Sequence, residues 1–203
     1  MFPCLCVLFY GLISQLYTRM KNHDKLDLFP KGKLRITLLR LCHELIENYG
    51  NFKDVVILGA QPRGIYLSRR IRELLGELVP SVEIPYGELD VTFFRDDFRT
   101  RNSPLSPNQT RIDFLIEDKK VILIDDVLFT GRTVRAGLDA MLAYGRPFSV
   151  ELLVLVDRKR SRDLPIEASY VGITVDTIET QRVEVELKES GGNDEVFLVS
   201  YEK

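Results

Sequence analysis

The stretch that most constrains the fold runs from Val121 to Thr133 and reads VILIDDVLFTGRT. Its first four residues are aliphatic and follow a polar segment, which is the pattern of a strand buried on both faces of a parallel sheet. Beyond the stretch, apolar residues recur at helical spacing, at Val134, Leu138, Met141 and Leu142. Residues 125–132 are therefore predicted to form the turn between a parallel strand and its helix, where open α/β sheets bind ligands.

The two halves of this turn favour opposite ends of one ligand. Thr130–Thr133 precedes a helix N-terminus, where free backbone N–H groups, two hydroxyls and the positive end of the helix dipole favour a phosphate. Asp125 and Asp126 repel phosphate, but they accept hydrogen bonds from vicinal hydroxyls such as those of a ribose, or help to hold a hydrated Mg²⁺. A group with a phosphate at one end and a diol at the other fits both halves.

This stretch resembles the phosphoribosyl-pyrophosphate (PRPP) binding motif of type I phosphoribosyltransferases, which consists of an apolar run, an acid pair, a spacer and T-G-x-T. Taken alone, the apolar run and acid pair also fit a Walker-B-like strand or an ordinary α/β strand end. The sequence contains no G-x-x-x-x-G-K-[ST], so a P-loop nucleotidase would lack its phosphate cradle. The resemblance implies an α/β fold with a central, mainly parallel twisted sheet flanked by helices and a small terminal hood.

Length and composition predict one soluble, enzyme-like domain. The chain has 203 residues, of which 45% are apolar and 29% charged, and the net charge of −2 argues against a protein whose main role is to coat nucleic acid. Cys4, Cys6 and Cys42 give no paired framework, and His23 and His43 give no metal-ligand spacing. A reducing, cytoplasmic setting is therefore predicted.

The N-terminal residues 1–19 form an apolar extension of unsettled status. The segment MFPCLCVLFYGLISQLY lacks a basic region and is shorter than the roughly 20 residues that span a bilayer. Met20 offers a second start, so residues 1–19 are interpreted as an upstream start assigned too early, with a weak peripheral anchor as the alternative. No stable membrane association is expected, and residues 20–203 are predicted to be a single phosphoribosyltransferase domain.

A second anion-facing loop is predicted between a buried strand, Asp54–Gly59, and a helix, Gly64–Leu75. The loop sequence has a Gly/Pro turn with an arginine, Arg63, at a helix start. It resembles the pyrophosphate loop of the same family, which in many members holds a cis peptide bond. We hypothesise that the Gln61–Pro62 bond is cis here; the alternative is that Pro62 begins the helix at its first position.

The remaining elements follow from periodicity and turn signals. Arg35–Tyr49 is predicted to be a helix that ends before Gly50, with an apolar face formed by Ile36, Leu39, Leu45 and Ile46. Residues 96–110 lack periodicity and are predicted to form a flexible loop, which in the family closes over PRPP. The predicted further strands are Glu88–Phe94, Val150–Val156, Ala168–Val171, Val183–Leu187 and Glu195–Ser200.

The match narrows to one family. The segments RGIYLSRRI, GELDVTFFRDD, DDVLFTGRTVRAGLDA, LVLVDR and LPIEASYVG resemble the PyrR family of pyrimidine operon regulators that are also uracil phosphoribosyltransferases. The resemblance covers almost everything from Arg35 to Glu186. It implies transfer of phosphoribose from PRPP to uracil, which gives UMP and pyrophosphate with Mg²⁺ as cofactor, and it implies a homodimer or homotetramer.

The resemblance also implies roles for particular residues. The catalytic set comprises Asp125 and Asp126, which would hold the ribose hydroxyls and through them the metal, and Arg63 and Arg95, which would stabilise the leaving pyrophosphate. Arg158 and Val183 would lie near the uracil. The implied substrate-binding residues are Pro62, Arg63, Arg95, Asp125, Asp126, Val127, Leu128, Phe129, Thr130, Gly131, Arg132, Thr133, Arg158 and Val183.

A regulatory role is implied as well. In the family, UMP-loaded protein binds a stem-loop in leader mRNA through a basic surface, and the matching candidates here are Arg40, His43, Lys159, Arg160 and Arg162. The chain departs from the family pattern where Leu39 replaces a usual threonine and where the loop after Arg158 is one residue longer. Because both departures are at RNA-facing positions, two functions stay open: an enzyme of uracil salvage, or an RNA-binding attenuator that uses its pocket only as a sensor.

Overall fold

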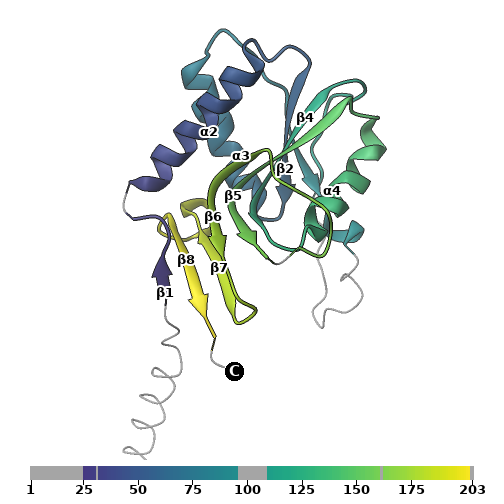
Figure 1. Ribbon diagram of the computed structural model, residues 1–203. Coiled ribbons are helices and arrows are strands. Elements are labelled where there is room, and N and C mark those ends of the chain that lie inside the picture. Colours follow the sequence, from purple (N-terminus) through teal and green to yellow (C-terminus); the bar gives the residue numbers. More distant parts are fainter. Residues whose placement is uncertain (1–24, 31, 96–108, 161, 202–203) are drawn as a thin grey trace, which may run out of the picture.

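The structure, a computed structural model, describes residues 25–30, 32–95, 109–160 and 162–201 and comprises a five-stranded and a three-stranded sheet with three α-helices in these ranges (Figure 1). The N-terminal extension and most of the predicted loop at 96–110 lie outside the described residues. The elements are β1 (Lys25–Asp27), α2 (Lys33–Tyr49), β2 (Val55–Gln61), α3 (Gly64–Leu78), β3 (Tyr86–Asp90), η1 (Thr92–Phe94), β4 (Lys120–Leu128), α4 (Arg132–Met141), η3 (Leu142–Tyr144), β5 (Ser149–Lys159), β6 (Tyr170–Asp176), β7 (Gln181–Glu186), η4 (Lys188–Ser190) and β8 (Glu195–Ser200).

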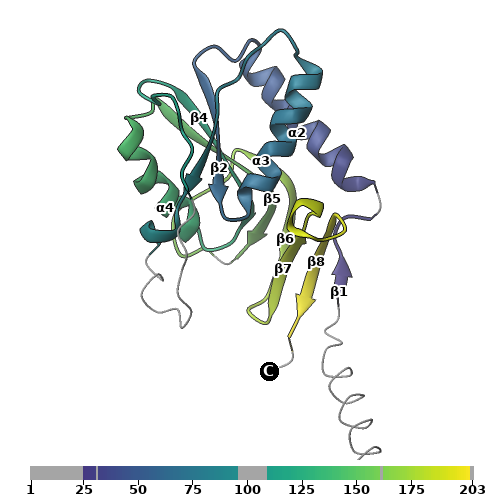
Figure 2. The ribbon, with the colours of Figure 1, turned by 180° about the vertical axis from the view of Figure 1, so that it is seen from behind.

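The central sheet has the order β3-β2-β4-β5-β6, and every neighbouring pair is parallel. Helices α2 and α3 cover one face and α4 covers the other (Figure 2). Successive residues of β2 therefore enter different cores: Ile57 packs with α2 and α3, whereas Val56 and Leu58 pack with α4. Covering both faces explains the continuous apolar runs in the sequence.

The connections of the central sheet create a place for a ligand. From β2 the chain passes through α3 to β3 at one edge, and then returns to β4 on the other side of β2. The direction of winding thus changes between β2 and β4, and the crevice at the carboxyl ends of these strands is the position where open α/β sheets bind ligands.

The smaller sheet, here called the hood, has the order β1-β8-β7 and is antiparallel. Its β7–β8 pair matches the predicted terminal strands closely, and β8 has the predicted bounds. β1 was not predicted because it has only three residues, all exposed. The predicted α/β architecture with a parallel sheet and a terminal hood is confirmed.

Two predicted boundaries near the ligand crevice were wrong. β4 does not end before the acid pair: Asp125 still pairs with Val154 of β5, and the strand continues to Leu128. At Asp125 the side chains become polar, but the backbone continues to pair with β5. The change from apolar to polar residues therefore did not indicate where the strand ends. The predicted strand Glu88–Phe94 stops at Asp90, because residues 92–94 turn into the short helix η1.

The apolar faces of two helices were predicted only in part. On α2, the predicted Leu45 is buried but Ile36 is 69% exposed, and the rest of the buried stripe runs through Leu34, Leu38 and Leu41. This helix carries apolar residues on more than half of its circumference, so spacing alone fits either stripe.

Of the apolar positions predicted at helical spacing, Val134 and Met141 of α4 are buried, whereas Leu138 of α4 and Leu142, the first residue of η3, are exposed. The buried face consists largely of small residues, because a Cβ added at Gly137 would lie 3.2 Å from Leu123 Cδ2. Close helix–sheet packing selects small side chains, and a search for large apolar residues misses them. Within the described ranges, no helix is both long enough and apolar enough to span a membrane.

Candidate active site

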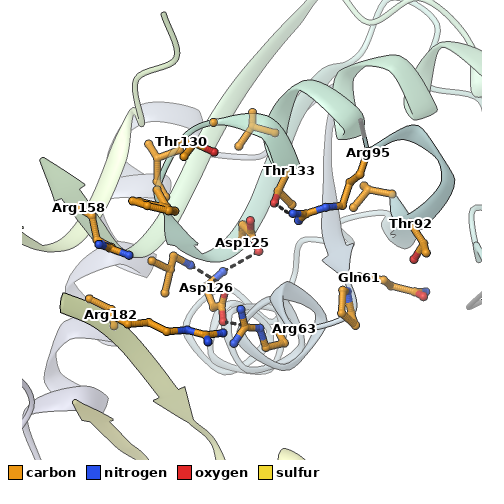
Figure 3. A pocket seen from close by; sticks show the side chains of 18 of the residues that line it. Gln61, Arg63, Thr92, Arg95, Asp125, Asp126, Thr130, Thr133, Arg158 and Arg182 are labelled. Atoms are coloured by element: carbon orange, nitrogen blue, oxygen red, sulfur yellow. Dashed lines mark hydrogen bonds and ion pairs between the residues drawn. The ribbon is translucent and has the colours of Figure 1, made fainter. Parts of the chain in front are cut away.

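The candidate site is a cavity of about 800 Å³ between the carboxyl ends of the central strands and the hood. The loop after β2 and the loop after β4 border it from the sheet, and β7 borders it from the hood (Figure 3). The pocket therefore lies at the switch point between β2 and β4. Its walls carry both cationic and anionic side chains, as a ligand with separate phosphate and hydroxyl groups requires.

The acid pair is buried at the floor of this pocket. Asp125 and Asp126 are only 6% and 4% exposed. Asp126 Oδ1 accepts the backbone N–H of Val127 at 2.8 Å, and its Oδ2 lies 3.3 Å from Arg63 Nε. Burial and the neighbouring charge of Asp126 raise the pKa of Asp125 well above its ordinary value. The two carboxylates can therefore accept cations or hydroxyl donors, although they repel each other electrostatically.

Helix α3 begins directly against this acid strand. A Cβ at Gly64 would lie 2.6 Å from Ile124 O and 2.9 Å from Asp125 Cα, so only glycine permits the approach. The Gln61–Pro62 bond is cis, which confirms the hypothesis made from the sequence. The alternative position for Pro62, as the first residue of the helix, is wrong because the helix begins at Gly64 with Arg63 as its N-cap.

The loop after β4, residues 129–131, leads into the N-terminus of α4. Gly131 has a φ of 90°, a left-handed conformation that glycine adopts without strain. Thr130 Oγ1 accepts the Arg132 N–H at 3.4 Å, and Thr133 Oγ1 accepts a hydrogen bond from Arg95 Nη1 at 2.7 Å. The segment 128–133, here called the phosphate loop, together with Arg95 brings hydroxyls, backbone N–H groups and a cation to one end of the pocket.

Next to the phosphate loop, one wall of the pocket is built around Arg158, which is 5% exposed. Its guanidinium carbon lies 3.9 Å from the centroid of the Phe129 ring. Its Nε donates to Thr177 Oγ1 at 3.1 Å and its Nη2 donates to the carbonyl of Gln181 at 2.8 Å. Burial and the nearby positive charge of Arg182 lower the pKa of Arg158. These contacts fix a flat cationic group beside an aromatic ring, a surface on which a planar ring can stack.

Comparisons with known proteins agree with this geometry. The model of the phosphoribosyl transferase domain matches residues 31–190. A bifunctional protein PyrR of Desulfosudis oleivorans is 45% identical over 165 residues, which cover 81% of this chain and 91% of that protein. A bifunctional protein PyrR of Caldicellulosiruptor bescii is 41% identical over 172 residues, 85% of this chain and 93% of the relative. The chain belongs to the PyrR family of phosphoribosyltransferases.

Solved structures show the same fold at low sequence identity. A hypoxanthine phosphoribosyltransferase of Trypanosoma cruzi matches with a TM-score of 0.64 at 16% identity, covering 87% of this chain and 97% of the other. A hypoxanthine-guanine phosphoribosyltransferase of Bacillus anthracis gives a TM-score of 0.63 at 13% identity, over 86% and 97% of the two chains. The PyrR family fold is thus that of the wider phosphoribosyltransferase group.

The structure brings nearly all of the substrate-binding residues implied by the PyrR family motif into one pocket. The exception is Arg132, whose Nε donates to Asp163 Oδ2 at 3.0 Å and whose side chain does not border the cavity. The residues that border it are Pro62, Arg63, Arg95, Asp125, Asp126, Val127, Leu128, Phe129, Thr130, Gly131, Thr133, Arg158 and Val183.

Several pocket residues were not found from the sequence. Arg182 extends from the hood toward Arg63 and Asp126 (Figure 3). The signal available in the sequence was its place next to the predicted Val183, because Gln181, Arg182 and Val183 all border the pocket. The other residues missed by sequence reasoning are Gln61, Val91, Thr92, Val134, Glu179, Gln181 and Tyr201.

The candidate RNA-binding residues of the PyrR family motif differ in their exposure and in their contacts within the protein. His43, Lys159 and Arg160 are exposed, and so is Arg40, although its guanidinium also donates to the carbonyls of Val171 and Gly172 at 2.8 Å each.

Arg162 corrects the prediction. Its guanidinium is turned inward and donates to backbone carbonyls and to Asp157, so this side chain is committed within the protein rather than presented to RNA.

Proposed function

We propose that this chain transfers the phosphoribosyl group of PRPP to uracil and releases UMP and pyrophosphate. The observation that carries the proposal is the placement of an acid pair and a phosphate loop at two positions in one pocket at the sheet's switch point. A ribose ring has hydroxyls and a 5′-phosphate at opposite ends, so it can satisfy both at once. The PyrR relatives support uracil as the base.

The phosphate loop binds the 5′-phosphate in this proposal. Thr130 and Thr133 supply hydroxyls, Gly131 permits close backbone approach, and the N–H groups at the start of α4 supply further donors. The guanidinium of Arg132 has no part in this set because it pairs with Asp163. Asp125 and Asp126 accept hydrogen bonds from the ribose 2′- and 3′-hydroxyls.

The reaction needs positioning and charge stabilisation, and no covalent nucleophile. As the bond between C1 of the ribose and the pyrophosphate oxygen breaks, positive charge builds on the sugar and negative charge on the leaving group. Arg63 and Arg95 stabilise the leaving pyrophosphate, and the buried carboxylates of Asp125 and Asp126 stabilise the sugar. The new bond forms between C1 and N1 of uracil, which loses its proton.

The acid pair also fits Mg²⁺. Asp126 Oδ2 is buried and accepts no hydrogen bond from the described residues, although Arg63 lies nearby, so it has capacity for a cation. Two carboxylate groups supply the hard oxygen ligands that Mg²⁺ prefers. When bound, Mg²⁺ would neutralise charge on the phosphate oxygens of PRPP, and Asp125 and Asp126 are the residues that would hold it through the ribose hydroxyls.

We further propose that uracil lies between the hood and the Phe129–Arg158 stack. Val183 is buried on the hood side and borders the pocket, where it would contact a flat base. Arg158 is held by Thr177 and by the Gln181 carbonyl, so its orientation is fixed before the base binds. A rigid, planar contact discriminates bases better than a mobile one.

The biological unit in this proposal is a homodimer or homotetramer of single domains that span residues 20–203 and act in the cytoplasm.

A second function, control of pyrimidine genes through a leader mRNA stem-loop when UMP is bound, is favoured by the exposed Lys159 and Arg160 at the end of β5 and by His43 on α2. Such cations contact the RNA backbone, so their contribution depends on salt. A sensor without catalysis is the alternative.

A direct assay tests the proposed enzyme. Purified protein is incubated with PRPP, Mg²⁺ and labelled uracil, and UMP and pyrophosphate are measured together. Wild-type protein should form both in equal amounts, and Asp126→Asn should lower turnover by about 100-fold or more with the fold intact, because it removes a ligand contact and no core volume. UMP-dependent RNA binding without any turnover would replace this proposal with the sensor.

A further inference from the structure

Arg162 is bonded to the carbonyl side of the phosphate loop. Its Nη1 donates to the carbonyls of Leu128, at 3.2 Å, and Phe129. The same nitrogen donates to the Arg158 carbonyl at 3.0 Å, and Nη2 donates to the buried carboxylate of Asp157. One guanidinium therefore joins the end of β4, which leads into the phosphate loop, to the end of β5, which carries Arg158.

The two residues after Arg162 continue the same contact. The N–H groups of Asp163 and Leu164 both donate to the Thr130 carbonyl, at 3.1 and 3.2 Å. The Asp163 carboxylate accepts a hydrogen bond from Arg132 Nε at 3.0 Å. Three consecutive carbonyls, those of residues 128–130, are thus bonded to the segment 162–164. Arg162 itself does not border the pocket, so these bonds reach the loop from behind.

The orientation of these carbonyls determines where the loop's donors point. In a planar trans peptide the C=O and the following N–H point in opposite directions. The carbonyls of Leu128, Phe129 and Thr130 point toward the segment 162–164. The N–H groups of residues 129–131 therefore point away from that segment, to the opposite side of the loop. That side borders the cavity. Backbone N–H groups that converge in this way form an anion site.

We propose that Arg162 is a positioning residue for phosphate binding: it holds the phosphate loop so that its N–H groups face the 5′-phosphate of the ligand. The inference rests on the proposed function and deepens it. Arginine suits this task because its planar fork donates to several carbonyls at fixed angles, which a lysine ammonium does not. The buried carboxylate of Asp157 compensates its charge.

The test uses ribose 5-phosphate, which carries the phosphate without the leaving group. Its Kd is measured by calorimetry for the wild type, Arg162→Lys and Arg162→Met, with Arg146→Met, an exposed arginine in the turn before β5, as the matched control. We expect the Kd to rise about tenfold or more in Arg162→Met, less in Arg162→Lys, and not in the control. The KM for PRPP should rise in parallel while kcat changes less than about threefold, because the phosphate contact is equal in ground and transition states.

A second variant protects the test against a folding defect. Arg162→Met leaves the buried Asp157 carboxylate without its partner, whereas the double variant Asp157→Asn with Arg162→Met removes both charges. An unchanged Kd for ribose 5-phosphate in the double variant, or a fall in kcat with an unchanged KM, would assign Arg162 a purely structural role and overturn the inference. Failure of the wild type to bind ribose 5-phosphate would instead refute the proposed function itself.

Discussion

Replacing Gly64 with alanine tests how closely helix α3 must approach the acid strand. The added Cβ would meet Ile124 O at 2.6 Å and Asp125 Cα at 2.9 Å, and both are backbone atoms that cannot rotate away. Overpacking of this kind costs about 1–3 kcal/mol, and the helix-propensity gain of an interior alanine does not apply because Gly64 is the first residue of α3. The free energy of unfolding should therefore fall by about 1–3 kcal/mol. Displacement of Asp125 should lower kcat/KM by about 100-fold.

Gly76 provides the matched control, since it lies on the same helix and an added Cβ meets nothing within 4 Å. Gly76→Ala should stabilise the protein by about 0.5–1 kcal/mol and leave phosphoribosyl transfer unchanged. Stability is measured by urea unfolding and activity by the formation of UMP. If Gly64→Ala matches the wild type in both, the contact between α3 and β4 does not position the acids, and the reasoning is refuted.

Three further predictions concern buried polar groups. Because burial and Asp126 raise the pKa of Asp125, its ionisation destabilises the fold at neutral pH. At pH values above the raised pKa of Asp125, Asp125→Asn should therefore raise the free energy of unfolding. Below about pH 3.8 the carboxyl of Asp125 is protonated in both the folded and the unfolded protein, so the gain should disappear there. Urea unfolding measured at several pH values checks this. Arg158→Ala should lower stability by about 2–3 kcal/mol in urea unfolding, and kinetics should show a KM for uracil about tenfold higher with an unchanged KM for PRPP. Burial raises the pKa of the Cys42 thiol to about 12, so peptide mass spectrometry should find Cys42 alkylated only after unfolding.

Much of the pocket could be predicted because its residues are contiguous in sequence. The spacing of the acid pair and T-G-R-T defines a strand end, a tight turn and a helix start, and local chemistry determines all three. The cis bond before Pro62 was predictable for the same reason. Arg132, which belongs to the same contiguous motif, pairs with Asp163 and does not border the pocket, and the sequence near it could not indicate this because Asp163 is 31 residues away.

Features that depend on distant contacts were missed. The hood supplies Arg182 and Tyr201 to the pocket; the family resemblance indicated only their neighbour Val183 in β7, and no pattern near Tyr201 indicates that it borders the crevice. Arg162 looked like part of a solvated basic loop, yet its partners are carbonyls of another strand. The faces of α2 and α4 were misjudged in part because helix packing against a sheet is decided by shape as much as by hydrophobicity.

The most direct test of the central claim is a competition between bases. Equal concentrations of uracil and hypoxanthine are supplied with PRPP and Mg²⁺, and the nucleotide products are separated by chromatography. The fixed stack of Arg158 on Phe129, together with membership of the PyrR family, predicts UMP as the product with little or no IMP. Formation of IMP in place of UMP would contradict the account, because the pocket would then serve a purine.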